Sequence, residues 1–333
     1  MKDKSQAEKT AAERQVELLS TALGSAPSAN GYWLNASGKT YPSFYPKGLT
    51  VSPFNALIMS LHSDKSGSKT NLFMLFSEAK RQGVAVREHE RGVPFLFYNW
   101  NQYVNRNNPK DIISRNDYQA LDVEQQKQYK GVHNREIRTL FCIDQTTMPF
   151  ANEKEYKKLL ADYGTAEERG QGEGDDRAMH VSFNDFLLKM RDNLVPIRTD
   201  GSGVAHYDTE KDAVYMPRQK DFEHYNDYVQ ETLRQIVSAT GHQQRLAREG
   251  MVMKNGTAPS EDAIKKERLV AELASGVKML ELGLPARLSE EGLHLTDYWV
   301  RELKENPCLI DAVESDVNNA LLVMRKAEQG EKI

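Results

Sequence analysis

Hydrophobic side chains recur at helical spacing along much of the chain, and the clearest example is the segment 225–246. There Leu233, Ile236 and Val237 fall on one helical face, and Gly241 stands near the end, where a cap or kink is expected. The same kind of pattern predicts further helices at residues 53–61, 69–83, 151–163, 181–193, 260–282, 293–305 and 309–328. The pattern therefore predicts a helix-rich chain, above all in its second half.

Short runs rich in strand-forming residues predict a small amount of sheet. These runs lie at residues 84–87, 94–100 and 138–145, and a further pair, 204–208 and 213–217, flanks a polar turn as in a β-hairpin. Residues 30–53 show no regular period and are expected to form loops around short strands. The predicted fold class is α+β, with helices against a small, mostly antiparallel sheet in the first domain and a mainly helical second domain with a β-hairpin.

Two polar segments interrupt these elements and indicate the domain limits. Residues 101–132 are rich in Asn, Asp, Gln and Lys, and we interpret them as an insertion, helical in part around 118–129, in a first domain of residues 1–150. Residues 151–180 hold a charged helix and a Gly- and acid-rich linker, and residues 181–333 form the second domain. The N-terminal segment 2–23 is either a short helix docking on the first domain or a frayed tail.

Composition and charge indicate where the protein is located and which kinds of partner it can have. No apolar run approaches the ~20 residues of a membrane span, and the charged N-terminus lacks a signal-peptide core, so we expect a cytoplasmic protein. Cys142 and Cys308 lie far apart and outside any CxxC pair, which argues against a disulfide framework or a Cys-based zinc site. The net charge of −4 divides into a basic first part, up to residue 150, and an acidic remainder. This division suits a polyanion partner for the first part, or is a chance imbalance on solvated surfaces.

Several short motifs occur in a fixed order along both halves. They are GKTY at 38–41, NALI at 55–58, VREHERG at 86–92, FLFYNW at 95–100, FCIDQ at 141–145, MP at 216–217, TGH at 240–242, RL at 245–246 and the segment 267–276. In this order they resemble the ArdC-type antirestriction proteins of plasmids and conjugative elements. The resemblance implies an N-terminal single-stranded-DNA-binding domain and a C-terminal zincin-like metallopeptidase domain. It also implies a mobile element as the setting, with conjugation or restriction proteins as partners.

The resemblance fails at the residues that would carry peptidase chemistry. The family's His-Glu-x-x-His motif falls on Arg234, Gln235 and Ser238, and its further carboxylate ligand on Glu272 or Glu267. Arg cannot lose its proton to bind a metal, Gln cannot act as a general base, and catalytic zinc takes about three protein ligands. We therefore expect a catalytically inactive domain with neither zinc nor another cofactor. In that domain the charge of Arg234 would replace the metal and pair with Glu272.

Other chemistries have weaker support. His206, His224 and His242 have no ligand-like spacing, so surface or packing roles are expected for them. The sequence has no GxSxG elbow and no GxxxxGK[ST] phosphate loop, and Cys142 lies in an apolar strand where burial is expected. Two alternatives remain open. One is an active metal-dependent hydrolase with a non-standard site, and the other is an interaction module whose acidic C-terminal half binds a basic partner.

Single-stranded DNA would be bound by aromatic side chains that stack bases and basic side chains that follow the backbone. Core burial is the alternative role for each aromatic residue. The candidates for stacking are Trp33, Tyr41 and Tyr45, and those for the backbone are Arg87, Arg91, Lys39, Lys47, Lys80 and Arg81. Arg87 and Arg91 flank a predicted turn between strands and are the first choice. No membrane partner is expected.

Overall fold

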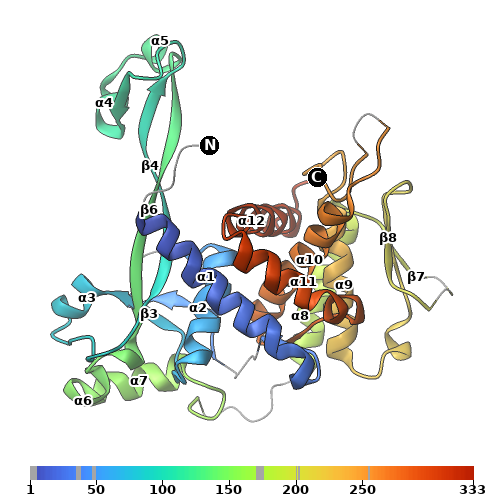
Figure 1. Ribbon diagram of the computed structural model, residues 1–333, viewed down its shortest axis with the longest axis horizontal. Coiled ribbons are helices and arrows are strands. Elements are labelled where there is room, and N and C mark those ends of the chain that lie inside the picture. The colour runs from blue at the N-terminus through green and yellow to red at the C-terminus, as the bar shows by residue number, and fades with distance from the viewer. Residues whose placement is uncertain are drawn as a thin grey trace.

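The computed structural model describes residues 6–34, 39–46, 50–169, 176–199, 201, 203–253 and 256–333. Its first half is built on a five-stranded sheet (Figure 1). Along the sheet the order is β2 (Ser43–Phe44), β3 (Leu72–Leu75), β6 (Tyr129–Cys142), β4 (Val93–Asn105) and β5 (Ile112–Ser114). All neighbours are antiparallel except β2 and β3, which confirms the predicted α+β class with a mostly antiparallel sheet.

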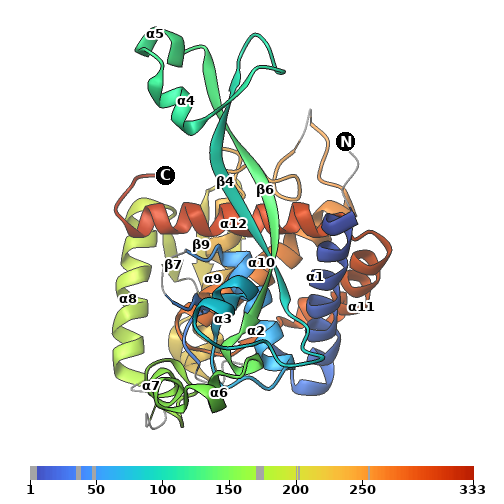
Figure 2. The same ribbon diagram turned by 90° about the vertical axis from the view of Figure 1, so that its left-hand side faces the viewer.

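The polar segment 101–132 forms the far part of a long β-hairpin. Strands β4 and β6 pair from Val93–Leu140 out to Asn105–Tyr129, and the ribbon projects from the rest of the molecule (Figures 1 and 2). Its tip carries β5 and two short helices, α4 (Arg115–Ala120) and α5 (Val123–Gln126), each begun by a capping box. The predicted helical content of this segment is confirmed, but the flanking strands run on through much of it.

The segment predicted as a helix at 69–83 is a strand followed by a short helix. Residues Leu72–Leu75 form β3, and α3 (Phe76–Arg81) follows, ended by Gly83 at a φ of +69°. A strand paired on both sides and covered on both faces has continuous apolar residues, and so mimics one wide helical face. The strand predicted at 84–87 is reduced to a single bridge, between Val86 and Thr146.

The second half is mainly helical, as predicted, and a three-stranded sheet lies at its outer edge beside α9 (Figure 1). The helices are α8 (Asp176–Asn193), α9 (Tyr225–Thr240), α10 (Glu261–Glu281), α11 (Glu290–Glu305) and α12 (Leu309–Glu328), and the strands are β7 (Ile197–Thr199), β9 (Ala213–Met216) and β8 (His206–Asp208) in that order along the sheet. Strands β8 and β9 make the predicted hairpin, and β7 adds to β9 in parallel. Ser260 caps α10 as predicted, its side chain accepting from Ala263 N.

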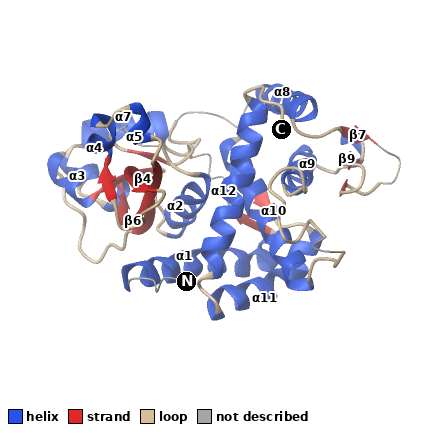
Figure 3. Ribbon diagram, turned by 90° about the horizontal axis from the view of Figure 1, so that it is seen from above, coloured by secondary structure: helices blue, strands red, loops and turns tan. Residues whose placement is uncertain are grey.

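The N-terminal segment joins the two halves. Helix α1 (Gln6–Ser25) packs on α2 (Pro53–Lys65) in the first half and on α11 in the second, and Figure 3 shows it beside both. Strand β1 (Tyr32–Leu34) then pairs with β10 (Ala286–Arg287). The docking helix is therefore confirmed, but it docks on both halves rather than on the first alone.

One continuous hydrophobic core runs through both halves. It includes Leu19 and Phe54 from the first half and Leu273 and Val317 from the second, all without exposed surface. A smaller core lies between the sheet and α7 (Glu153–Tyr163), the charged helix predicted at 151–163, which follows α6 (Met148–Ala151). Within the described residues, no helix combines the length and hydrophobicity needed to cross a membrane.

Candidate functional site

The site that the sequence singles out lies where α9 packs against α10. Arg234 on α9 is 9% exposed and Glu272 on α10 is 2% exposed, and Nε of the arginine lies 2.9 Å from Oε2 of the glutamate. The same guanidinium donates to Glu231 at 2.7 Å and to the carbonyl oxygen of Arg287. Burial opposes the charge of Arg234, but Glu272 and Glu231 raise its pKa, so the cation is retained. The predicted pairing of Arg234 with Glu272 is confirmed.

The second oxygen of Glu272 is engaged as well. Its Oε1 accepts from the backbone N of Ser289 at 2.9 Å and from the Ser289 hydroxyl at 2.5 Å. Ser289 is the N-cap of α11, and its Oγ also accepts from Gly292 N at 2.9 Å. A Cβ at Gly292 would lie 2.7 Å from Glu272 Oε1, so a side chain there would displace the Glu272 carboxylate. Both carboxylate oxygens are thus occupied by protein donors.

Gln235 and Ser238 complete the part of α9 that was compared with the peptidase motif. Gln235 donates through Nε2 to Glu231 Oε1 at 2.7 Å, which ties it to the same acidic side chain as Arg234. Ser238 is buried, with 4% of its surface exposed.

Glu267, the other carboxylate considered from the sequence, belongs to a second buried ion pair. Arg248 holds it in a bidentate contact, with distances of 2.8 Å from Nε to Oε2 and 2.6 Å from Nη2 to Oε1. Both side chains are 4% exposed. The guanidinium also donates to Thr240 Oγ1 and to Val237 O, which fastens the turn after α9 to α10. This geometry is that of a structural charge pair.

The donor set does not fit a metal ion. Each of the two buried carboxylates is neutralised by an arginine, and the described residues contain no cluster of three or more His, Cys, Asp or Glu suited to a metal. His206 stacks on Tyr215, His242 packs edge-on against Tyr207, and His224 is exposed at the start of α9. The structure therefore does not bring the three histidines together.

A cleft of about 780 Å³ opens beside this network, and we call it the α9 cleft. Strand β8 and the residues before it form one wall, α9 forms the floor, and α10 and the start of α11 form the other wall. Its lining residues include Val204, Glu231, Arg234, Ser238, Met253, Ile264, Arg268, Glu290 and Glu291.

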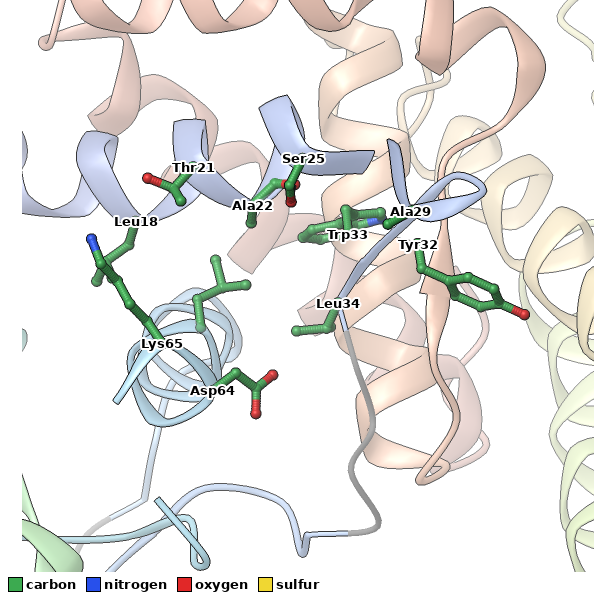
Figure 4. A pocket seen from close by; sticks show the side chains of 11 residues that line it. Leu18, Thr21, Ala22, Ser25, Ala29, Tyr32, Trp33, Leu34, Asp64 and Lys65 are labelled. Atoms are coloured by element: carbon green, nitrogen blue, oxygen red, sulfur yellow. The ribbon is translucent and has the colours of Figure 1, made fainter. Parts of the chain in front are cut away.

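A second cavity, of about 520 Å³, lies between α1, β1 and α2 (Figure 4). Its walls are mostly apolar, with Leu18 and Leu61 among them. The two charged residues on its wall are already paired: Asp64 with Lys39 at 2.9 Å and Lys65 with Glu17 at 2.7 Å. This cavity therefore presents no free charged group that would select a ligand.

Several residues predicted to bind DNA are buried, which corrects their assignment. Trp33 is 4% exposed and packs on Gly276 of α10, so its ring cannot stack a base. Lys39 is 7% exposed and bound to Asp64 and Ser63. The sequence did not reveal these roles, because the apolar residues around Trp33 and Lys39 have no regular period that separates core from surface.

The two tyrosines are also largely committed to the fold. The Tyr41 hydroxyl is fully buried, and burial raises its pKa. Tyr45 is half-buried and donates to Glu155 Oε1 at 3.4 Å. Lys47 lies outside the described residues, as do residues 170–175 of the predicted linker.

The remaining predicted basic residues are exposed and close together in sequence. Lys80 lies over the ring of Phe76, with Nζ 5.0 Å from the centroid, and Arg81 pairs with Glu78. Arg87 pairs with Glu90 at 2.6 Å, and Arg91 makes no ion pair with any described residue. Phe76 is 52% exposed, and sequence analysis missed it because it was counted in the apolar face of one long helix.

The segment 86–92, which we call the basic loop, is held by Gln145. Its Nε2 donates to Glu90 Oε2 at 2.9 Å and to Arg91 O at 3.1 Å, and its backbone O accepts from Arg87 N at 3.0 Å. Its Oε1 accepts from Cys142 N and contacts the buried ring of His62 at 3.1 Å. Cys142 is buried, as predicted, and burial raises the pKa of its thiol to about 12. The basic loop is therefore fixed to the core by one amide side chain.

Comparison with known proteins agrees with this two-part construction. Residues 12–141 match the N-terminal domain of anti-restriction factor ArdC, and residues 188–314 match a zincin-like metallopeptidase family. No curated protein sequence matches the chain.

Two crystal structures of the antirestriction ArdC protein from plasmid R388 share the fold at a TM-score of 0.61. The metal-free structure is 18% identical and covers 96% of this chain and 99% of its own, and the Mn(II)-bound structure is 17% identical and covers 94% and 97%. On both domain matches, this chain is an ArdC-type protein, with the N-terminal domain of an anti-restriction factor followed by a zincin-like metallopeptidase domain.

Proposed function

We propose that this ArdC-type protein binds single-stranded DNA through its N-terminal half, in the cytoplasm of a cell that carries a mobile element. In this proposal the zincin-like domain has no peptidase activity and holds no metal. Conjugation or restriction proteins are its expected partners. The observation that carries the proposal is the contrast between the two halves: exposed cations in one and a closed charge network at the peptidase position in the other.

The DNA-binding part rests on Phe76, Lys80, Arg81, Arg87 and Arg91. An exposed ring flanked by cations provides both elements of sequence-tolerant single-strand binding, a stacking platform and a path for phosphates. Arg81 and Arg87 each form an ion pair with one glutamate, which a phosphate would have to displace. Arg91 has no such ion pair with a described residue, so it can bind a phosphate without breaking one. The anchoring of the basic loop by Gln145 keeps Arg87 and Arg91 in place and lowers the entropy lost when they bind.

The test is fluorescence anisotropy of a labelled single-stranded oligonucleotide with the full chain at increasing salt. Arg91→Ala should weaken binding and reduce the salt slope by about 0.7, the contribution of one phosphate contact on a single strand. Phe76→Ala should cost about 1–3 kcal/mol of binding free energy, the value of one stacked base. Lys304→Ala, an exposed lysine of α11, is the matched control and should change nothing. Binding that is absent, or that ignores salt, contradicts the DNA-binding proposal.

The absence of catalysis rests on the chemistry of Arg234. The permanent cation of Arg234 is paired with Glu272, the carboxylate that a metal would need. Its contacts to Glu272, Glu231 and the carbonyl oxygen of Arg287 hold it there. A divalent ion brought to this point would meet a like charge in a buried site, where electrostatic repulsion is strong.

Metal analysis tests this part directly. Protein purified without chelators should contain no stoichiometric zinc or manganese. The combined substitution Arg234→His, Gln235→Glu and Ser238→His should create zinc uptake measurable by calorimetry, with Glu272 then free to serve as a ligand. Stoichiometric metal in the unaltered chain contradicts the proposal and supports the alternative of a metal-dependent hydrolase.

A further inference from the structure

We propose that a bound single strand continues from the basic loop onto helices α6 and α7, where Phe150 stacks a further base and Lys154 and Lys158 bind phosphates. This extension rests on the proposed function, because it assigns new contacts to the same strand. Three features carry it: a second exposed ring, a hydrogen-bonded link that fixes this ring near the basic loop, and a face of α7 that is formed by lysines.

Phe150 is an exposed ring on a fixed backbone. It is 76% exposed, more than any other large apolar side chain in the described part of the chain. Met148, two residues earlier, is 1% exposed and lies in the smaller core, so α6 turns one apolar side chain inward and the other outward. The backbone N of Phe150 donates to Thr147 O at 3.0 Å. A ring presented in this way loses little entropy when a base stacks on it.

A short antiparallel ladder links α6 to the basic loop. Thr147 N donates to Ala85 O at 2.7 Å. At the other end of the ladder, Arg87 N donates to Gln145 O at 3.0 Å. The basic loop therefore leaves the ladder at one end and α6 leaves it at the other. Two residues of a strand span about 7 Å, so one strand of DNA can contact both ends.

Helix α3 lies at the α6 end of this ladder. Val84 N donates to Ala79 O of α3 at 3.0 Å, and both residues pack with Met148 in the smaller core. Figure 1 shows α3, α6 and α7 at the same side of the first half, and Figure 2 turns this side toward the viewer. A strand that stacks one base on Phe76 can therefore reach Phe150 without passing around the molecule.

The exposed face of α7 provides cations next to α6. The side chains of α7 in the smaller core are Tyr156, Leu159 and Leu160, and its exposed lysines are Lys154, Lys157 and Lys158. At about 100° per residue, the lysines fall on the face opposite the buried residues. Lys157 pairs with Glu153 at 2.6 Å, whereas Lys154 and Lys158 make no ion pair with a described residue. Like charges one turn apart repel each other, so an anion that binds both is favoured.

This arrangement selects an unpaired strand. A base within a duplex is stacked between its neighbours, so its face is closed to Phe76 and Phe150, whereas the bases of a single strand can turn onto both rings. Ring stacking and phosphate contacts read no base edge. The extended site should therefore accept single strands of any sequence.

The experiment measures anisotropy of a fluorescein-labelled oligothymidylate with the full chain at several salt concentrations. The oligonucleotide is about 20 nucleotides long, which exceeds the ~4–16 nucleotides of typical single-strand sites. Phe150→Ala should weaken binding about 5- to 150-fold, the effect of losing one stacked base. Lys154→Ala combined with Lys158→Ala should reduce the salt slope by about 1.4, the contribution of two phosphate contacts on a single strand.

Fluorescence distinguishes stacking from a general loss of binding. Phe150→Trp should keep the affinity, and its added tryptophan emission should be quenched when the oligonucleotide binds. Leu322→Trp, at a residue of α12 that is 50% exposed, adds a tryptophan in the second half and should show no quenching. Leu322→Ala is the matched control for truncation, and Lys189→Ala combined with Lys304→Ala is the control for charge. Both should bind as the unaltered chain does, and exposure of all these positions should leave thermal unfolding unchanged.

The outcomes distinguish the extension from the proposal on which it rests. Salt-dependent binding that is unchanged by Phe150→Ala and by the loss of both lysines overturns the extension and leaves the proposed DNA binding intact. Quenching of Leu322→Trp as strong as that of Phe150→Trp, or equal weakening by the control variants, also overturns the extension. An oligonucleotide that does not bind the unaltered chain contradicts both.

Discussion

Removing Arg234 should destabilise the protein far more than removing an exposed arginine of the neighbouring helix. Arg234→Met leaves Glu272, 2% exposed, with the two donors of Ser289 but without its cation. Breaking a buried pair by deleting one partner costs about 3–5 kcal/mol, because the remaining charge is both desolvated and unpaired. Arg268→Met is the control: its pair with Glu291 has exposed fractions of 43% and 56%, and such surface pairs are worth about 1 kcal/mol or less.

The double variant Arg234→Met with Glu272→Gln decides whether the pair itself is responsible. Glutamine keeps an acceptor for Ser289 but carries no charge, so most of the penalty of the single variant should disappear. The double variant should then be more stable than the sum of the single changes predicts, by about 1–3 kcal/mol. Urea denaturation followed by circular dichroism is the assay, since urea does not screen charges as guanidinium chloride does. If Arg234→Met costs no more than Arg268→Met, or the two single changes simply add, the pair does not hold α9 to α10.

Three further changes test other parts of the fold. Gly276→Ala would place a methyl group 2.4 Å from the Trp33 ring and should cost about 1–3 kcal/mol in urea denaturation, whereas Gly24→Ala, with 3.9 Å of room, should not destabilise. Burial lowers the pKa of His62, so the unfolded chain binds a proton at higher pH than the folded chain does, and the free energy of unfolding should fall as the pH drops below 6.5. Urea midpoints measured at several pH values test this, and His62→Gln should make them depend less on pH. Gln145→Leu should speed amide exchange in the basic loop, with exchange in α12 unchanged as the internal reference.

The helices of the second half were predictable because their signals are local. The helix predicted at 309–328 matches α12, and Ser260 caps α10 as expected, since apolar period and capping chemistry depend only on neighbouring residues. The motif resemblance also led to the prediction that Arg234 pairs with Glu272. Their separation of 38 residues carries no local signal, so the resemblance to a known fold, rather than periodicity, supplied this pair.

The candidate DNA-binding residues show the opposite case. Trp33, Lys39 and Arg91 all stand in stretches of sequence without a regular apolar period, yet two are buried and one is exposed. Burial there depends on distant partners, such as Gly276 of α10 for Trp33 and Asp64 of α2 for Lys39. No pattern within a few residues could distinguish them.

By itself, then, the sequence determined the α+β class and the helices of the second half, because propensity and period are properties of the residues in place. Tertiary structure alone decided that β3 is a strand, that residues 101–132 extend a hairpin, and that α1 ties the two halves into one core. It also decided that Arg234 reaches Glu272 and that Ser238 lines the cleft beside this pair. These outcomes depend on contacts between residues far apart in the chain. Such contacts are set when the segments pack together, and no local pattern encodes them.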